Sequence, residues 1–283
     1  MIFKAGKYQF DLQRSPVIMG ILNITPDSFS DGGKFSSEDS ALFHCERMIN
    51  EGADIIDVGG ESSRPGSDRV SAEEEIERIL KIVEKINSRF QICLSVDTYK
   101  PKVALEVLKS GADIINDITG LSVSDDIARL TNEYGAGLCL MHMKRDPKIM
   151  QSYTEYDDII VEIKDFLKNS ILKAMNAGMK KEALILDPGI GFGKDIIGNK
   201  TILSQLRSFM DLGCPLLIGT SRKSFIGEIN GKDVNNRLNG TLASNVIAYI
   251  NGARIFRVHD VQENKDSLFV ASEILNSGVK VEA

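Results

Sequence analysis

Short runs of apolar residues recur along this chain, and longer stretches with helical periodicity separate them. Eight of these runs lack the polar alternation of a half-exposed strand, which is typical of strands buried on both faces. The runs are Val17–Leu22, Ile55–Val58, Ile92–Val96, Ile114–Ile118, Gly137–Met141, Leu184–Leu186, Leu216–Ile218 and Ile255–Val258. Their ends are spaced by roughly 20 to 45 residues, which is enough for a strand, a helix and two loops.

The stretches between the runs carry residues that begin and end helices. Ser71 and Glu74 have the spacing of a capping box, and apolar residues follow them at helical intervals. Pro101 suits the first position of a helix, and Gly111 suits the position just beyond its end. The stretch 41–52 has the same pattern. These segments therefore predict helices between the strands.

A short motif repeats inside the chain. Gly-Ala-Asp-Ile-Ile occupies residues 52–56 and again 111–115, and the weaker Gly-Ala-Arg-Ile-Phe occupies 252–256. Each copy has the form of a helix stop followed directly by a strand, as repeated βα units require. Eight strands with helices between them favour a (β/α)8 TIM barrel, an α/β fold, over an open doubly wound sheet.

The N-terminal residues predict a small addition to the barrel. Residues 1–15 have the pattern of a short β-hairpin with Gly6 at its turn, and residues 16–283 supply the barrel. No low-complexity linker divides the chain, so we expect a single domain over residues 1–283. A chain of 283 residues that is 42% hydrophobic can bury a substantial core.

Charge and cysteine content narrow the classes of function. The formal net charge of −6 gives no sign of a nucleic-acid or membrane partner, since these usually require a basic face. The four cysteines have neither CxxC nor zinc-ligand spacing, so we expect buried thiols in a reducing compartment. The N-terminus lacks a sustained apolar segment and no apolar run reaches ~20 residues, which predicts a cytoplasmic protein.

Polar residues gather where the predicted strands end. In strand order they are Asn23, Asp57, Asp97, Asn116 with Asp117, His142, Asp187, Lys223, and Arg257 with His259. The carboxyl ends of barrel strands converge on one rim, where the active sites of this fold lie. One such residue is usually a loop hydrogen bond, but polar residues at nearly all eight ends predict a site.

Three of these residues could recognise a guanidine-like heterocycle. Asp97, Asn116 and Asp187 belong to the middle strands, and carboxylates accept paired hydrogen bonds from the N–H and amino group of such a ring, for example a pterin. Two alternatives stay open. Asp97 could cap a helix, and Asp187 could belong to a turn over 187–189.

Positive and donor groups collect on the last strands. Lys223 follows the seventh strand, Arg257 and His259 mark the eighth, and closure of the barrel would bring them beside Asn23. Barrels often hold phosphate after strands seven and eight, and the segment 221–224 could open a short helix whose N–H groups also favour anions. The alternative is that Arg222 or Lys223 lies on a solvated face.

Three loops add further candidates. The glycine-rich segment 187–194 matches neither GxGxxG nor a P-loop, and its glycines instead predict tight turns that present Phe192 to a ligand. The loops 25–33 and 61–66 carry Phe29 and Arg64, and they suit a lid over a second substrate. The alternative for both loops is surface variation.

Taken together, these segments resemble the dihydropteroate synthase family. The matching motifs follow the family order over about residue 17 to the C-terminus, and they are 19–33, 57–66, 95–98, 116–118, 141–143, the loop from 187, 221–224 and 257–260. Any one of them is weak, but the combination is very specific. Ser63 stands where the family usually has Thr, which keeps the hydroxyl and loses a methyl group.

The resemblance implies a transferase of folate biosynthesis that is a target of sulfonamides. It would join 6-hydroxymethyl-7,8-dihydropterin pyrophosphate to p-aminobenzoate, by dissociative substitution at the pterin methylene carbon. The implied catalytic residues are Lys223, Asp97, Asp187 and Arg257, and the implied pterin-binding residues are Asp97, Asn116, Ile118, Met141, Asp187 and Lys223. The implied pyrophosphate-binding residues are Asn23, Arg257 and His259, and the implied p-aminobenzoate-binding residues are Phe29, Ser63, Arg64, Pro65, Phe192, Lys223 and Ser224.

The resemblance also implies a Mg²⁺ cofactor near Asn23 and Asp31, and a homodimer formed through late helices such as 238–250 or 268–275. Two other functions share parts of the pattern. A methyltetrahydrofolate methyltransferase that serves a corrinoid protein would share the pterin pocket without needing the cation cluster. A catalytically inactive pterin-binding subunit would be marked by loss of that cluster, which is intact in this sequence.

Overall fold

Eight parallel strands form a closed barrel in the computed structural model, which describes residues 1–24, 37–62, 66–145 and 148–277. The strands are β3 (Val17–Asn23), β4 (Ile55–Gly59), β5 (Cys93–Asp97), β6 (Ile114–Asp117), β7 (Gly137–Met141), β8 (Leu184–Asp187), β9 (Leu216–Ile218) and β10 (Ala253–Val258). They are hydrogen-bonded in chain order, and β10 closes onto β3. The eight predicted runs are therefore all strands, and their ends agree to within two residues.

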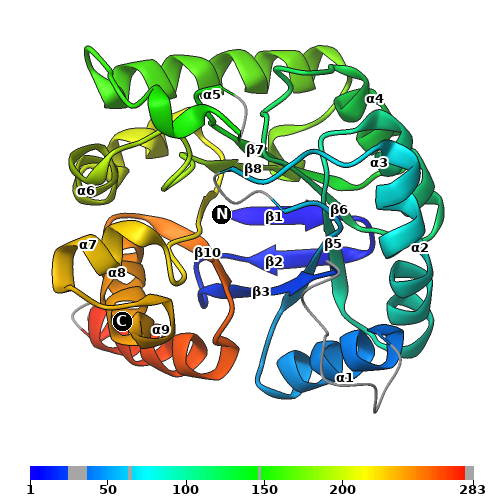
Figure 1. Ribbon diagram of the computed structural model, residues 1–283, viewed down its shortest axis with the longest axis horizontal. Coiled ribbons are helices and arrows are strands. Elements are labelled where there is room, and N and C mark those ends of the chain that lie inside the picture. The colour runs from blue at the N-terminus through cyan, green and yellow to red at the C-terminus, as the bar shows by residue number, and fades with distance from the viewer. Residues whose placement is uncertain (25–36, 63–65, 146–147, 278–283) are drawn as a thin grey trace, which may run out of the picture.

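Helices surround the strands as an outer ring (Figure 1). They are α1 (Ser37–Asn50), α2 (Ala72–Arg89), α3 (Pro101–Lys109), α4 (Asp126–Glu133), α5 (Ile159–Asn176), α6 (Ile196–Ser204), α7 (Ser224–Asn230), α8 (Leu238–Ile250) and α9 (Val261–Asn276), with 3-10 turns at Met150–Ser152, Lys181–Ala183, Leu206–Leu212 and Val234–Asn236. The Ser71 side chain accepts a hydrogen bond from the Glu74 N–H at 3.1 Å, and α3 begins at Pro101. The predicted helix starts are confirmed at both places.

The Gly-Ala-Asp motif has one structural role in both of its copies. Its glycine has a φ of +96° each time, a left-handed conformation that ends the preceding helix. Its aspartate then returns to the previous strand: Asp54 Oδ2 accepts from the Ile18 N–H at 2.8 Å, and Asp113 Oδ2 accepts from the Leu94 N–H at 3.0 Å. Each aspartate thus satisfies a strand N–H at the bottom of the barrel and fixes where the next strand starts.

The N-terminal hairpin closes this bottom end. β1 (Ile2–Ala5) and β2 (Tyr8–Asp11) pair antiparallel on either side of Gly6, whose φ is +53°. In Figure 1 the hairpin lies over the middle of the ring of helices. The buried Phe3 packs against the first inward-facing residues of the barrel strands, such as Met19 and Ile255. A Cβ added to Gly137 would lie 2.8 Å from the Phe3 ring, so the glycine at the start of β7 leaves space for the Phe3 side chain of the hairpin.

Two apolar layers hold the barrel together. The outward-facing strand residues pack against the helices in the main core, and the first inward-facing residues pack against the hairpin. The four cysteines are buried and unpaired, as predicted. Within the described residues, no helix is both long enough and apolar enough to span a bilayer. The inward-facing positions nearer the carboxyl ends of the strands are polar, and they form the candidate site.

Candidate active site

The site begins where the inward-facing positions of the strands change from apolar to polar. On β4, for example, Ile55 packs in the lower core, and Asp57, two residues on, faces the same interior. Strand register then aligns three of the predicted residues at one level. Asn23 is paired with Gly59, Gly59 with Asp97, and Asp97 with Asn116.

Asp57 is the fully buried centre of this polar layer. Its carboxylate accepts from Ser95 Oγ at 2.6 Å, Asn116 Nδ2 at 3.2 Å and Arg257 Nε at 2.6 Å. A buried carboxylate requires such partners, because its desolvation is otherwise very costly. Asp57 therefore orients one residue predicted to bind the pterin and one predicted to bind pyrophosphate.

Arg257 bridges the acids of neighbouring strands. Its Nη2 donates to Asp97 Oδ2 at 3.0 Å, while its Nε donates to Asp57. Burial opposes ionisation of the guanidinium, but the charges of Asp57 and Asp97 outweigh this effect and raise the pKa of Arg257. Arg257 is thus a fixed cation inside the barrel mouth.

The Asp97 carboxyl has a strongly raised pKa. Burial raises its pKa to about 8, the charges of Asp57, Glu75 and Glu61 act in the same direction, and Arg257 opposes them. Helix capping does not explain this residue, because α3 starts only at Pro101. A ligand that brings N–H donors to Asp97 would favour its ionised form.

Asp187 and Lys223 form the other side of the mouth. Burial raises the pKa of Asp187, and Lys223 is the strongest of the nearby cations that oppose this shift. Burial lowers the pKa of Lys223 to about 8, against the attraction of Asp187. One oxygen of Asp187 accepts from the Gly189 N–H at 2.7 Å, so the turn proposed as an alternative is also present.

The glycine-rich loop after β8 makes the tight turns that were predicted, and it packs Phe192 against the apolar cluster of Tyr99, Ile118 and Met141. Gly189, Gly191 and Gly193 all have positive φ values, of +75°, +82° and +62°. The Lys223 ammonium lies 4.5 Å from the centre of the Phe192 ring and also donates to the Ile190 carbonyl. A Cβ at Gly191 would lie 3.1 Å from the Lys223 side chain, so the glycine permits this close approach.

A small apolar cluster lines the same mouth. Tyr99, Ile118 and Met141 pack together, with Met143 and Phe192 against them. The cluster supplies flat and flexible apolar surface beside the polar groups of Asp97 and Asp187, which suits an aromatic heterocycle with polar edges.

His259 and the 221–224 segment lie next to Arg257 on the last two strands. The Ser221 hydroxyl contacts His259 Nδ1 at 2.9 Å and accepts from the His259 N–H at 3.2 Å. Arg222, with a φ of +57°, is in an ion pair with Asp260 through Nε at 3.0 Å. The predicted short helix is α7, which begins at Ser224 directly after Lys223. Arg222 therefore braces this turn and is not a freely solvated side chain.

Two of the strand-end polar residues do not face the site. Asp117 accepts from the Thr119 N–H at 2.8 Å and the Leu121 N–H at 2.8 Å, so its carboxylate organises the turn after β6. The His142 ring packs edge-on against Phe166 of α5, with ring centres 4.9 Å apart. The prediction that these two side chains converge with the others is wrong, because each directly follows a residue that faces inward.

Five predicted residues lie outside the described part of the chain, and they are Phe29, Asp31, Ser63, Arg64 and Pro65. The segment before the 63–65 gap is nevertheless anchored near the site. Glu61 accepts from Tyr99 OH at 3.0 Å, from Lys100 Nζ at 2.5 Å and from the Val70 N–H at 3.2 Å.

Sequence reasoning noted Asp57 at a strand end and assigned it no role. Ser95 and Lys194 entered only as parts of motifs, with no role of their own. A signal for Asp57 was present, because an acidic residue between the apolar Ile56 and Val58 faces the barrel interior if those neighbours face the helices.

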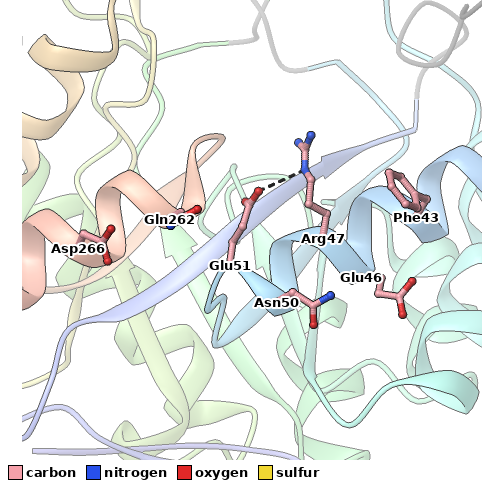
Figure 2. A pocket seen from close by; sticks show the side chains of 7 residues that line it. All are labelled: Phe43, Glu46, Arg47, Asn50, Glu51, Gln262 and Asp266. Atoms are coloured by element: carbon pink, nitrogen blue, oxygen red, sulfur yellow. Dashed lines mark ion pairs between the residues drawn. The ribbon is translucent and has the colours of Figure 1, made fainter.

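A separate hollow of about 380 Å³ lies between α1 and α9 on the outer layer, and Figure 2 shows its side chains. It is lined by Phe43, Glu46, Arg47, Asn50, Glu51, Gln262 and Asp266. Arg47 pairs with Glu51 at 3.4 Å. Solvated acids and an i,i+4 ion pair are typical of a helix surface, so the barrel mouth is the better candidate site.

Comparison with known proteins agrees with this geometry. A family described as pterin binding enzyme matches residues 19–259. The dihydropteroate synthase of Escherichia coli (strain K12) is 48% identical over 262 residues, which cover 93% of each chain. That of Clostridium beijerinckii is 47% identical, covering 92% of this chain and 95% of its own.

Solved structures have the same fold over nearly the whole chain. A Yersinia pestis dihydropteroate synthase with a sulfonamide drug complex superposes with a TM-score of 0.91 at 42% identity, covering 98% of this chain and all of its own. A Xanthomonas albilineans dihydropteroate synthase with 4-aminobenzoic acid superposes with a TM-score of 0.90 at 37% identity, covering 97% and 98%.

Proposed function

The chain belongs to the dihydropteroate synthase family, and from this premise we propose that its barrel mouth condenses 6-hydroxymethyl-7,8-dihydropterin pyrophosphate with p-aminobenzoate. The products are 7,8-dihydropteroate and pyrophosphate, so the enzyme is a transferase. One observation carries the assignment to this site. Asp97, Asn116 and Asp187 lie at the same mouth as the cations Lys223 and Arg257, which suits a donor-rich ring that bears an anionic tail.

The acidic side of the mouth recognises the pterin in this proposal. Asp97 and Asp187 accept hydrogen bonds from the N–H and amino groups of the ring, and Asn116 offers both a donor and an acceptor. Ile118 and Met141 pack against the ring, because they belong to the apolar cluster beside these acids. The two carboxylates also favour positive charge that develops on the pterin.

The cationic side binds the leaving group. The bond between the pterin methylene carbon and the pyrophosphate oxygen breaks, and the electron pair leaves with pyrophosphate. Arg257 and Lys223 stabilise this growing charge, and His259 and Asn23 bind the same group from the adjoining strands. Arg257 is charged and held in place before the bond breaks, so little reorganisation is needed as charge develops on the leaving group.

The second substrate approaches from the side of the glycine-rich loop. Phe192, Lys223 and Ser224 shape its site, together with Phe29, Ser63, Arg64 and Pro65 of the two loops outside the described residues. The amine of p-aminobenzoate then attacks the methylene carbon, a C–N bond forms, and the amine loses a proton. Holding the amine in line with the carbon makes this step effectively intramolecular.

We propose Mg²⁺ as the cofactor, bound mainly through the pyrophosphate. Among the described residues, no three His, Cys, Asp or Glu side chains are grouped to hold a metal ion. Mg²⁺ keeps several waters and uses substrate phosphates with only one or two protein ligands, so it does not require such a group. Asn23 and Asp31 are the proposed ligands, and the ion would neutralise charge on the leaving group.

A product assay tests the function. The purified protein is incubated with both substrates and Mg²⁺, and dihydropteroate and pyrophosphate are measured. We expect equimolar products, and Lys223→Ala is expected to lower kcat/KM by about a hundredfold or more. Lys200→Ala, on the exposed face of α6, serves as the control.

Absence of both products with the unaltered protein would contradict the proposed function. Unchanged kinetics in Lys223→Ala would remove only Lys223 from the site. A corrinoid methyltransferase or an inactive pterin-binding subunit would bind a pterin and release no pyrophosphate, so the same assay separates these alternatives.

We further propose a cytoplasmic homodimer. The buried free cysteines suit a reducing compartment. Exposed apolar side chains on α8 and α9 support self-association, because they lie on two helices that pack against each other. They are Ile247, Ile250, Phe269, Val270 and Ile274, which are 44% to 66% exposed.

A further inference from the structure

Lys194 is a second lysine at the glycine-rich loop, and the mechanism above gives it no role. The residue is only 3% exposed, although lysine side chains are rarely buried. Its Nζ lies 3.0 Å from His142 Nδ1, 3.3 Å from the His142 carbonyl oxygen and 2.8 Å from the Phe192 carbonyl oxygen. Burial lowers the pKa of Lys194 well below its usual range, and Lys223 and Lys144 act in the same direction. In either protonation state the amine nitrogen can make three hydrogen bonds, and these three contacts match that capacity.

These contacts join the loop to the end of β7. The Phe192 carbonyl belongs to the loop, whereas both His142 atoms belong to the residue that follows the strand. The loop also packs directly on this strand end, because a Cβ at Gly189 would lie 2.0 Å from the His142 carbonyl oxygen. Lys194 therefore holds the loop against the end of β7.

His142 is a suitable anchor for this contact. Burial lowers its pKa to about 2, and the charge of Lys194 acts in the same direction. The ring is consequently neutral and can accept at Nδ1. Its edge-on packing against Phe166 fixes its orientation, so Lys194 binds a rigid partner.

Other contacts hold the same loop at separate atoms. Lys223 donates to the Ile190 carbonyl from the site side, Asn199 Oδ1 accepts from the Gly191 N–H at 2.7 Å, and Tyr156 OH donates to the Gly193 carbonyl at 2.9 Å. Of these partners, Lys194 is the one that binds the carbonyl of Phe192 itself. Its loss would therefore act most directly on the position of the Phe192 ring.

We propose that Lys194 is a positioning residue for the second substrate: it fixes the backbone at Phe192 so that the aromatic ring stays against Lys223, where p-aminobenzoate binds. The inference rests on the proposed placement of p-aminobenzoate at Phe192. The hydrogen bonds of Lys194 go to His142 and Phe192 and include neither Asp97 nor Asn116. Its charge acts on the third pterin-binding residue, Asp187, more weakly than that of Lys223 does. Substitution of Lys194 is therefore expected to discriminate between the two substrates.

Lys194→Met tests the proposal, with Lys200→Met as the matched control on the exposed face of α6. Loss of the buried amine leaves the Phe192 carbonyl without its side-chain donor and is expected to raise KM for p-aminobenzoate about tenfold or more. The dissociation constant of a pterin ligand is expected to change by about threefold or less. Hydrogen exchange of the backbone amides at 189–193 is expected to accelerate, while exchange in β5 and β6 stays unchanged.

Equal loss of affinity for both substrates, or unchanged loop exchange and unchanged KM, would overturn the proposal. If Lys194→Met fails to fold, Lys194→Gln keeps an N–H donor group on a shorter side chain and is expected to give a smaller shift in the same direction. Wild-type values in Lys194→Gln would also overturn the proposal. Phe192→Ala tests the placement of p-aminobenzoate at Phe192 separately from the role of Lys194. If Phe192→Ala leaves KM for p-aminobenzoate unchanged, the proposed placement fails, and loop exchange in Lys194→Met still decides the role of Lys194.

Discussion

Burial changes the acid–base behaviour of individual residues in the barrel mouth. Asp97 and Lys223 have opposite charges when ionised, yet burial brings the pKa of each to about 8. Arg257 stays charged, because Asp57 and Asp97 face it directly. The charges of Asp97 and Lys223 in the free site therefore change with pH near neutrality. A ligand with N–H donors for Asp97 and an anionic group for Lys223 would favour the ionised form of both residues.

The pH dependence of pterin binding follows from these shifts. Donors on the pterin favour ionised Asp97, so its pKa falls in the complex, and affinity rises by up to about tenfold per pH unit until pH 8. Above pH 8, Lys223 loses its proton and affinity falls. We expect maximal affinity near pH 8 for 6-hydroxymethyl-7,8-dihydropterin pyrophosphate, whose anionic tail Lys223 binds, measured by calorimetry without p-aminobenzoate.

Asp97→Asn gives the control for this profile. The amide cannot ionise, so the rise between pH 6 and 8 should vanish while the fall above pH 8 remains. A flat profile for the unaltered protein would show that Asp97 is already ionised in the free site.

At the scale of elements, the same hydrogen bond from a strand N–H to an aspartate occurs at the start of two strands. The aspartates of the two Gly-Ala-Asp copies bind the N–H groups of Ile18 and Leu94. Residues of neighbouring strands are then brought into register, and Asn23, Gly59, Asp97 and Asn116 come to one level. The register that places the site residues at the carboxyl ends of the strands is thus set partly by contacts at their amino ends.

Asp113→Ala tests this device. The substitution leaves the buried N–H of Leu94 without its side-chain acceptor, which is expected to lower the free energy of unfolding by about 1–3 kcal/mol. Urea unfolding measures the change, and Glu84→Ala on the exposed face of α2 is the control. A loss no larger than that of the control would mean that water replaces the carboxylate.

At the scale of the whole molecule, one end of the barrel is closed by the hairpin and the other end carries the candidate active site. The hairpin closes the bottom through Phe3, and the polar layer forms the other mouth. The helices that follow β9 and β10, α8 and α9, carry the exposed apolar side chains proposed for dimerisation. Both helices follow the part of the chain that carries Lys223 and Arg257, and α8 packs against β10, which bears Arg257.

Ile274→Asp tests the dimer. Ile274 is 66% exposed on α9, and a charge buried in an apolar interface strongly opposes association. Light scattering after size exclusion is expected to give twice the 31.1 kDa chain mass for the unaltered protein and a single chain mass for the variant. Val161→Asp, on the exposed face of α5, should remain dimeric. A monomeric unaltered protein would refute the proposed homodimer.

The sequence by itself determined the strands, the helix starts and most of the candidate residues. Buried parallel strands are continuous apolar runs, and glycine, proline and capping residues mark where helices begin and end, so these features are local. The motif order was equally local, and it identified the family before any geometry was known. The glycine-rich loop was also recognised as a support for Phe192.

Only the tertiary structure decided which way the strand-end residues face and what they contact. Asp117 ends its strand just as Asp187 does, and His142 directly follows its own, yet Asp117 and His142 turn away from the mouth. Asp57 and Arg257 are 200 positions apart and meet because the barrel closes. Such pairings depend on register and closure, which are properties of all eight strands together. The burial that shifts the pKa values of Asp97 and Lys223 arises in the same way.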